Sequence, residues 1–144
     1  MEDRERYISN AIRWAKEQLG SKEYLTLCLA FVEDAYENSN NVEIFGGSTA
    51  KESADEYGAS DNRGVPEKGA FVFYDCFGTI NDEYENWGHV GLCIGNGQVI
   101  HAWDIVRVEH YKDIEELKPA PGWTSPKYIG WAAVDRVFKG YRVL

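Results

Sequence analysis

Cysteine is scarce in this chain. Only three cysteines occur among the 144 residues, and no two of them form a Cys-x-x-Cys pair. Three is an odd number and too few for a disulfide-stapled fold. A structural zinc site is disfavoured as well, because such sites usually draw on paired cysteines. The cysteines are therefore expected to be either small buried residues or reactive thiols.

Basic residues are also in short supply. Fifteen Lys and Arg stand against twenty-four Asp and Glu, which gives a formal net charge of -9. An acidic chain without a basic run is a poor binder of nucleic acid or of anionic membranes. Residues 33–61 hold eight acidic residues and one lysine, Lys51. A solvated acidic face is the favoured interpretation, and a rim that attracts a cationic ligand is the alternative.

Long apolar runs are missing too. The start, Met1-Glu2-Asp3-Arg4-Glu5, has no apolar region of the kind that a secretory signal needs. The longest stretch without a charged residue, Asn86 to Trp103, contains two histidines, several glycines and a turn, so it is not a membrane span. We expect a chain that is cytoplasmic when made, acts away from membranes, and leaves the cell, if at all, by a non-classical route.

What is present is typical of one globular domain over residues 1–144. Hydrophobic residues make up 44% of the chain and charged residues 27%. Apolar residues at helical spacing predict a helix over 4–18, and a second helix is expected from Thr26 to about Asn38. Thr26 is the candidate N-cap, which puts Cys28 in the first turn. Residues 38–47 are expected to be loop, and Thr49 with Glu52 fits a capping box for a short helix over 49–57.

From Gly69 onward the hydrophobic period changes to two. Strands are predicted over 70–75, 88–94, 98–103, 105–110 and 128–137. Helices first and strands afterwards, with short connections, indicate an α+β fold in which N-terminal helices pack on an antiparallel sheet.

Cys28 is the first residue that could carry chemistry. Unpaired N–H groups at a helix start favour a thiolate, which is the nucleophilic form, so a lowered pKa is expected there. The competing interpretation is a buried core cysteine beside Leu27 and Phe31. Cys76 and Cys93 are alternative nucleophiles, although Cys93 is expected in the core and Cys76 has no predicted helix start beside it.

Two histidines on neighbouring strands are the second feature. His89 begins a predicted strand and can act as a general base, and His101 lies on the next strand. A two-residue turn at Asn96-Gly97 would place the two on opposite faces of the sheet. A three-residue turn, Gly95-Asn96-Gly97, would place His101 opposite Gly91 and diagonal to His89 on one face. The second register supports a hydrogen bond that orients the base.

A metal site made of His89, His101 and Asp104 is a further alternative, although no spacing fixes a third ligand. His110 has no visible partner. No cofactor is expected.

Three segments together resemble the NlpC/P60 family of papain-like cysteine peptidases, which cut bacterial cell-wall peptides. They are Cys28-Leu29-Ala30-Phe31-Val32, Pro66 to Tyr74, and Gly88 to Ala102. The resemblance covers about residues 8–135 and is sparse between 38 and 64. It implies a cysteine peptidase or amidase acting on peptidoglycan stem peptides, with Cys28 as nucleophile, His89 as base and His101 as the residue that orients the base. It also implies a helix with the cysteine packed on an antiparallel sheet with both histidines.

The sequence departs from the family around the cysteine. Leu27, Leu29 and Ala30 replace the usual Asp before the cysteine and Ser-Gly after it, and the preceding aromatic loop is shortened. Tyr24 stands in for its aromatic residue, and Tyr24, Trp87 and Gly88 are expected to contact substrate. The Cys-Leu-Ala-Phe-Val run also resembles the related CHAP amidases. A catalytically idle peptide- or acyl-binding module on the same fold is the alternative of another class. The chain is expected to be a monomer.

Overall fold

A computed structural model describes residues 2–144. Two long helices, α1 (Arg4–Glu17) and α2 (Cys28–Asn40), come first, followed by β1 (Val42–Glu43), α3 (Ala50–Tyr57) and the short 3-10 helix η1 (Ala59–Asp61). The other elements are β2 (Phe71–Asp75), β3 (Phe77–Ile80), β4 (Glu83–Asn86), β5 (His89–Gly95), β6 (Gln98–Ala102), β7 (Val106–His110), η2 (Asp113–Glu116), β8 (Lys127–Ala132), α4 (Val134–Val137) and β9 (Arg142–Val143).

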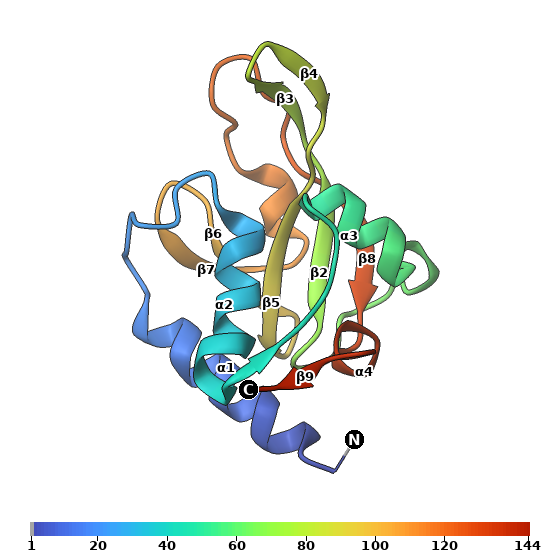
Figure 1. Cartoon of the computed structure of the whole chain (residues 1–144). Helices are drawn as coiled ribbons and strands as arrows, with labels where there is room; N and C mark the ends of the chain where they lie inside the picture. The colour runs from blue at the N-terminus through green and yellow to red at the C-terminus, as the bar shows by residue number, and fades with distance from the viewer. Residues whose placement is uncertain (1) are drawn as a thin grey trace.

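The centre of the fold is a five-stranded antiparallel sheet in the order β7-β6-β5-β2-β8. Helix α2 packs against β5 and β6, α1 packs against α2, and α3 packs against β2 and β8 (Figure 1). A separate hairpin of β3 and β4 extends beyond the end of the sheet at which β5 begins. The expected α+β architecture, with N-terminal helices packed on an antiparallel sheet, is confirmed.

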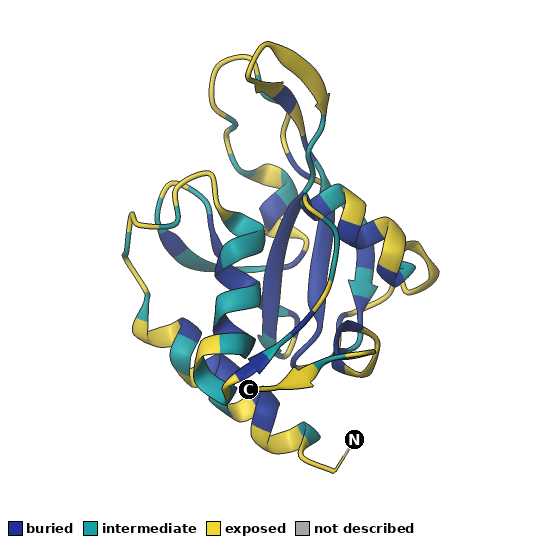
Figure 2. Cartoon of the chain, in the orientation of Figure 1, coloured by how far each residue is buried: buried dark blue, intermediate teal, exposed yellow. Residues whose placement is uncertain are grey.

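Each face of the sheet has its own apolar cluster. The helix-facing cluster joins the inner residues of α1, α2 and α3 to Phe71, Phe73, Val90, Leu92 and Ile100. The second cluster, on the other face, is smaller and contains Val72, Tyr74, Cys93, Val99, Tyr111 and Ile114. Strands β2 and β5 are buried along nearly their whole length (Figure 2). Burial on both faces explains why Phe71–Tyr74 is a continuous apolar run, since neither face meets water.

The helix predictions are confirmed with one correction. Helix α3 starts as the capping box predicts, since the Thr49 hydroxyl accepts a hydrogen bond from Glu52 N at 3.1 Å. Thr26 is not the cap of α2. Its φ is +65°, a left-handed conformation, and Leu27 occupies the cap position without a side-chain bond. The cap therefore lies one residue later than predicted, and Cys28 is the first residue of the helix.

The strand predictions are correct for β2, β5, β6 and β7 and wrong at the end of the chain. The predicted strand over 128–137 stops at Ala132, and α4 follows it. Residues 38–47, expected as loop, contain the end of α2 and β1, which pairs with β9. The β3–β4 hairpin was not predicted, because its exposed residues lack the alternation that marks a half-buried strand.

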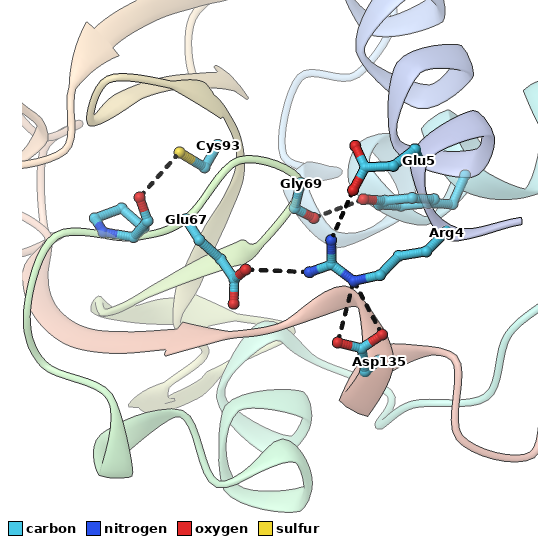
Figure 3. Close-up of polar contacts among 8 residues, drawn as sticks. Arg4, Glu5, Glu67, Gly69, Cys93 and Asp135 are labelled. Carbon is cyan, nitrogen blue, oxygen red and sulfur yellow. Dashed lines mark hydrogen bonds and ion pairs between the residues drawn. The ribbon is translucent and has the colours of Figure 1, made fainter. Parts of the chain in front are cut away.

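Arg4 links the start of α1 to α4 and to the loop before β2. Its guanidinium contacts the carboxylates of Glu5, Glu67 and Asp135 at 3.0–3.1 Å (Figure 3). Nearby, the Tyr36 hydroxyl donates a hydrogen bond to the Gly69 carbonyl at 2.6 Å. Within residues 2–144, no helix has both the length and the apolar character needed to cross a membrane.

Candidate active site

The two histidines meet because of a bulge in the β5–β6 hairpin. The turn itself has two residues, Asn96 and Gly97, both with positive φ, which suits a type I′ turn. Gly95 pairs with Gln98, but Cys93 pairs with Val99, which leaves Ile94 as an extra residue in β5. This bulge shifts the register by one, so His101 comes to lie beside Gly91 on the face of His89. The predicted register is correct, and the predicted three-residue turn is not.

His89 and His101 form a buried hydrogen-bonded pair. The His89 Nε2 lies 2.9 Å from the His101 Nδ1, and the residues are 4% and 0% exposed. Aromatic rings hold His89 from two sides. Trp103 meets it edge-on with ring centroids 5.1 Å apart, and Tyr74 lies at 6.1 Å. Since Nε2 of His89 is used by His101, its Nδ1 is the nitrogen available for a proton from elsewhere.

A carboxylate continues this chain of contacts. The His101 Nε2 lies 2.5 Å from the Glu109 Oε1, and Arg107 Nε donates to the other Glu109 oxygen at 2.9 Å. The register of β6 with β7 brings them together, since His101 pairs with Arg107 and Val99 with Glu109. Sequence reasoning missed Glu109. The signal that could have found it is the spacing of Arg107 and Glu109. They lie two residues apart, and so on one face, in a strand predicted to follow that of His101.

Cys28 lies where α2 approaches the beginning of β5. The first turn of α2 and the first residue of β5 are at the same end of the molecule, below the β3–β4 hairpin (Figure 1). The backbone N–H of Val90, the residue after His89, faces the thiol, together with the N–H groups of Leu29 and of Cys28 itself. The histidine pair is on the sheet face away from α2, so Cys28 comes closest at the strand's start. Among residues 2–144, no hydrogen bond joins the Cys28 thiol to His89.

Burial controls the protonation of both groups. It raises the pKa of the Cys28 thiol above its usual value, and the backbone N–H groups of Val90, Leu29 and Cys28 offset this only in part. The expectation of a lowered pKa at the helix start is therefore wrong, because removal from water outweighs the helix terminus. Burial, and secondarily the nearby His101, lower the pKa of His89 well below the usual histidine value. Both shifts favour the uncharged forms, a protonated thiol and an unprotonated imidazole.

Residues 18–119 match the family model of the NlpC/P60 family. The chain belongs to the NlpC/P60 family. A search of curated protein sequences finds no significant match. NlpC/P60 proteins are generally cysteine peptidases or amidases of the cell wall, and the matched region includes Cys28, His89, His101 and Glu109.

The other two cysteines of this NlpC/P60 chain are occupied by structural contacts. Cys93 is buried in the second cluster, and its thiol donates to the Pro66 carbonyl at 3.6 Å (Figure 3). The Cys76 thiol donates to the Thr124 carbonyl at 3.5 Å, and burial raises the pKa of Cys76 to about 11. Cys28 is the only one of the three that is partly exposed.

Asp104 does not join the histidine pair. Its carboxylate accepts from Ile105 N and from Arg107, on the outer side of that arginine. Across residues 2–144 there is no group of three His, Cys, Asp or Glu side chains arranged to hold a metal ion. The proposed ligand set of His89, His101 and Asp104 is therefore not brought together. His110 packs elsewhere, against Tyr111 and the Gly97 turn.

The predicted substrate-contacting residues have structural partners. The Tyr24 hydroxyl donates to Asp34 at 2.7 Å, and its ring packs on Phe31. The Trp87 indole donates to the Gly78 carbonyl at 2.9 Å, at the base of the β3–β4 hairpin. Gly88 has a φ of +76°, and an added Cβ would lie 2.6 Å from Lys51 N at the start of α3. Trp87 and Gly88 directly precede His89 in the chain and are held by the β3–β4 hairpin and the start of α3. Their contact with substrate stays a prediction.

Proposed function

We propose that this chain is a thiol hydrolase that cleaves an amide bond of peptidoglycan stem peptides, with residues 1–144 acting as one catalytic domain. In this proposal Cys28 is the nucleophile, His89 is the general base and His101 orients His89. The observation that carries the proposal is the 2.9 Å contact between two buried histidines at the strand start that Cys28 approaches. Nucleophilic acyl transfer needs a thiol and a base that can take its proton, and a second side chain commonly orients that base.

In the proposed reaction, the starting state has a protonated Cys28 thiol and an unprotonated His89 imidazole. As the sulfur attacks the amide carbonyl, His89 Nδ1 takes the thiol proton and later gives it to the leaving amine. The thiolate forms only as attack begins, because burial opposes a standing thiolate–imidazolium pair. The N–H groups of Cys28 and Leu29 at the start of α2 point toward the thiol and are candidates to stabilise the oxyanion. Water then hydrolyses the thioester.

Digestion of purified peptidoglycan, with mass spectrometry of the released fragments, tests the proposal. The wild-type protein should release peptide fragments, and Cys28→Ala should release none. Cys76→Ala is the matched control, because it removes another buried thiol near the site and should retain activity. Failure of the wild-type protein to release any fragment, in a preparation shown to be folded, would contradict the proposal and favour an idle binding module. Release of intact stem peptides would indicate a CHAP-like amidase instead.

A further inference from the structure

Glu109 is more buried than an ordinary surface carboxylate and has a partner for each oxygen. Its side chain is only 14% exposed, and both of its oxygens are used, one by His101 and one by Arg107. Arg107 is in turn held by Asp104 at 3.1 Å on the outer side. The result is a continuous path, His89–His101–Glu109–Arg107, that crosses three neighbouring strands from the site toward the sheet edge.

The proton positions along this path follow from the charge of Glu109. Burial raises its pKa, but hydrogen bonds from His101 and Arg107 outweigh this, and the pKa of Glu109 is lowered below its usual value. An ionised carboxylate only accepts hydrogen bonds, so His101 must carry a proton on Nε2. When Nε2 carries the only ring proton of His101, its Nδ1 is bare and accepts a hydrogen bond from Nε2 of His89. His89 in turn keeps its Nδ1 free of a proton.

We propose that Glu109, clamped by Arg107, is a positioning residue of this site: its carboxylate sets the tautomers of both histidines so that His89 Nδ1 is left free to accept the thiol proton. This inference rests on the proposed function for its catalytic meaning, but the tautomers exist in the free protein. Glu109 itself never touches substrate. Without an acceptor at position 109, His101 could turn its proton to Nδ1, and His89 would then present a protonated nitrogen to Cys28.

Nuclear magnetic resonance of protein labelled with ¹⁵N in its histidine rings tests the proposal without any substrate. Long-range ¹H–¹⁵N correlations distinguish the two tautomers and the imidazolium. In wild-type protein, His89 and His101 should each carry a proton on Nε2 and none on Nδ1. The chain has three histidines, and His110→Gln removes the signals of the third. A proton on Nδ1 of either residue, or an imidazolium at His101, would overturn the proposal.

Substitutions at position 109 supply the second measurement. Glu109→Ala should give mixed tautomers for both histidines and lower the peptidoglycan cleavage rate at least tenfold. Glu109→Gln, whose amide oxygen can still accept from His101, should retain the Nε2 tautomers and more of the activity. Asp104→Asn is the matched control, since it removes a carboxylate from the other side of Arg107 and should leave the tautomers unchanged. If Glu109→Ala folds and keeps the wild-type tautomers, the positioning role is wrong.

The two proposals fail separately. If wild-type protein shows the expected tautomers but cuts no peptidoglycan, the proposed function is wrong while the role of Glu109 in setting the tautomers stands. If it cuts peptidoglycan through Cys28 but the tautomers differ, the proposed function stands and the assignment to Glu109 falls.

Discussion

An added Cβ at Gly91 would lie 3.0 Å from the Cβ of His101 and 2.4 Å from Cγ1 of Val99. The absence of a side chain at this position on β5 makes the room in which His101 reaches across toward His89. Any larger residue would have to push β6 away or turn His101 aside. Gly91 is thus a spacing element of the candidate site, although it takes no part in the chemistry.

Gly91→Ala should therefore damage both the fold and the site. Overpacking of this kind costs about 1–3 kcal/mol of stability, and displacement of His101 should lower cleavage of peptidoglycan beyond what stability explains. Thermal unfolding and a fragment-release assay at a temperature where the variant is folded check this. Adding Val99→Ala removes the closest clash and should recover part of the stability. Gly64→Ala, at a position with open space, is the matched control and should be neutral.

Cys28 should be the first thiol alkylated, but slowly at neutral pH. It is the one partly exposed cysteine, and burial raises its pKa, so the thiolate fraction should increase about tenfold per pH unit from pH 6 to beyond pH 8. Peptide mapping after timed exposure to iodoacetamide at several pH values measures this. First labelling at Cys76 or Cys93 would contradict the assignment of the nucleophile. A plateau of reactivity below pH 7 would contradict a raised pKa of the Cys28 thiol.

The two histidines should differ in their tolerance of substitution. His89→Ala removes the base and should lower the cleavage rate by about 10²–10⁴-fold. His101→Gln should cost less than His101→Ala, because an amide can still hold His89 by a hydrogen bond. Equal losses for the two His101 variants would argue against an orienting role. Since the pKa of His89 is lowered, its basic form persists into mild acid, and the acid limb of kcat/KM should lie below the usual histidine value of about 6.5.

Substrate choice should favour amides with apolar surroundings over the plain γ-D-glutamyl-diamino acid bond usual for the family. Leu27, directly before Cys28, is 49% exposed, and Leu29 follows it on α2. A site that presents apolar groups lacks the polar partners that discriminate strongly for a polar substrate. Parallel measurement of kcat/KM on defined muropeptides checks this. Efficient cleavage of the standard bond, with little on other amides, would refute the preference and leave the thiol mechanism intact.

Glu33 should make stability depend on pH. Its half-buried carboxyl has a pKa raised to about 7 by burial and by the charges of Glu37 and Asp34. The folded state thus holds a proton that the unfolded chain releases near pH 4.3, and stability should fall as the pH rises from there through 7. Allowing for solvent screening, the loss is about 1 kcal/mol.

Glu33→Gln removes this effect. Its Tm should exceed that of the wild type by about 3–5 °C at pH 8 and by almost nothing at pH 4. Thermal unfolding followed by circular dichroism across this range is the measurement. Glu17→Gln, at an exposed position on α1, should show no such trend. A gain for Glu33→Gln that is the same at both pH values would show that the carboxyl does not titrate as expected.

The candidate site was predictable where a short-range pattern determined it. The position of Cys28 at a helix start and the alternation around His89 and His101 both follow from hydrophobic periodicity, and the structure agrees. The turn was not predictable from the same pattern, because Gly95-Asn96-Gly97 suits two turn lengths, and the bulge at Ile94 reconciles the tight turn with the shifted register. The pKa of Cys28 was predicted in the wrong direction, since how deeply a thiol is buried depends on chain segments far away.

The C-terminal end of α2 lies beside α1 and beside Leu144. Asn40, the last residue of α2, donates to the Tyr7 carbonyl of α1, and Leu144 donates through its backbone to Asn41. Helix α2 has thirteen residues and is therefore about 20 Å long, so Asn40 and Cys28 lie about that far apart at its two ends. An affinity tag, a fluorophore or a surface linker attached at Leu144 would therefore stand well clear of the Cys28 thiol. Protein immobilised through that point should present Cys28 outward.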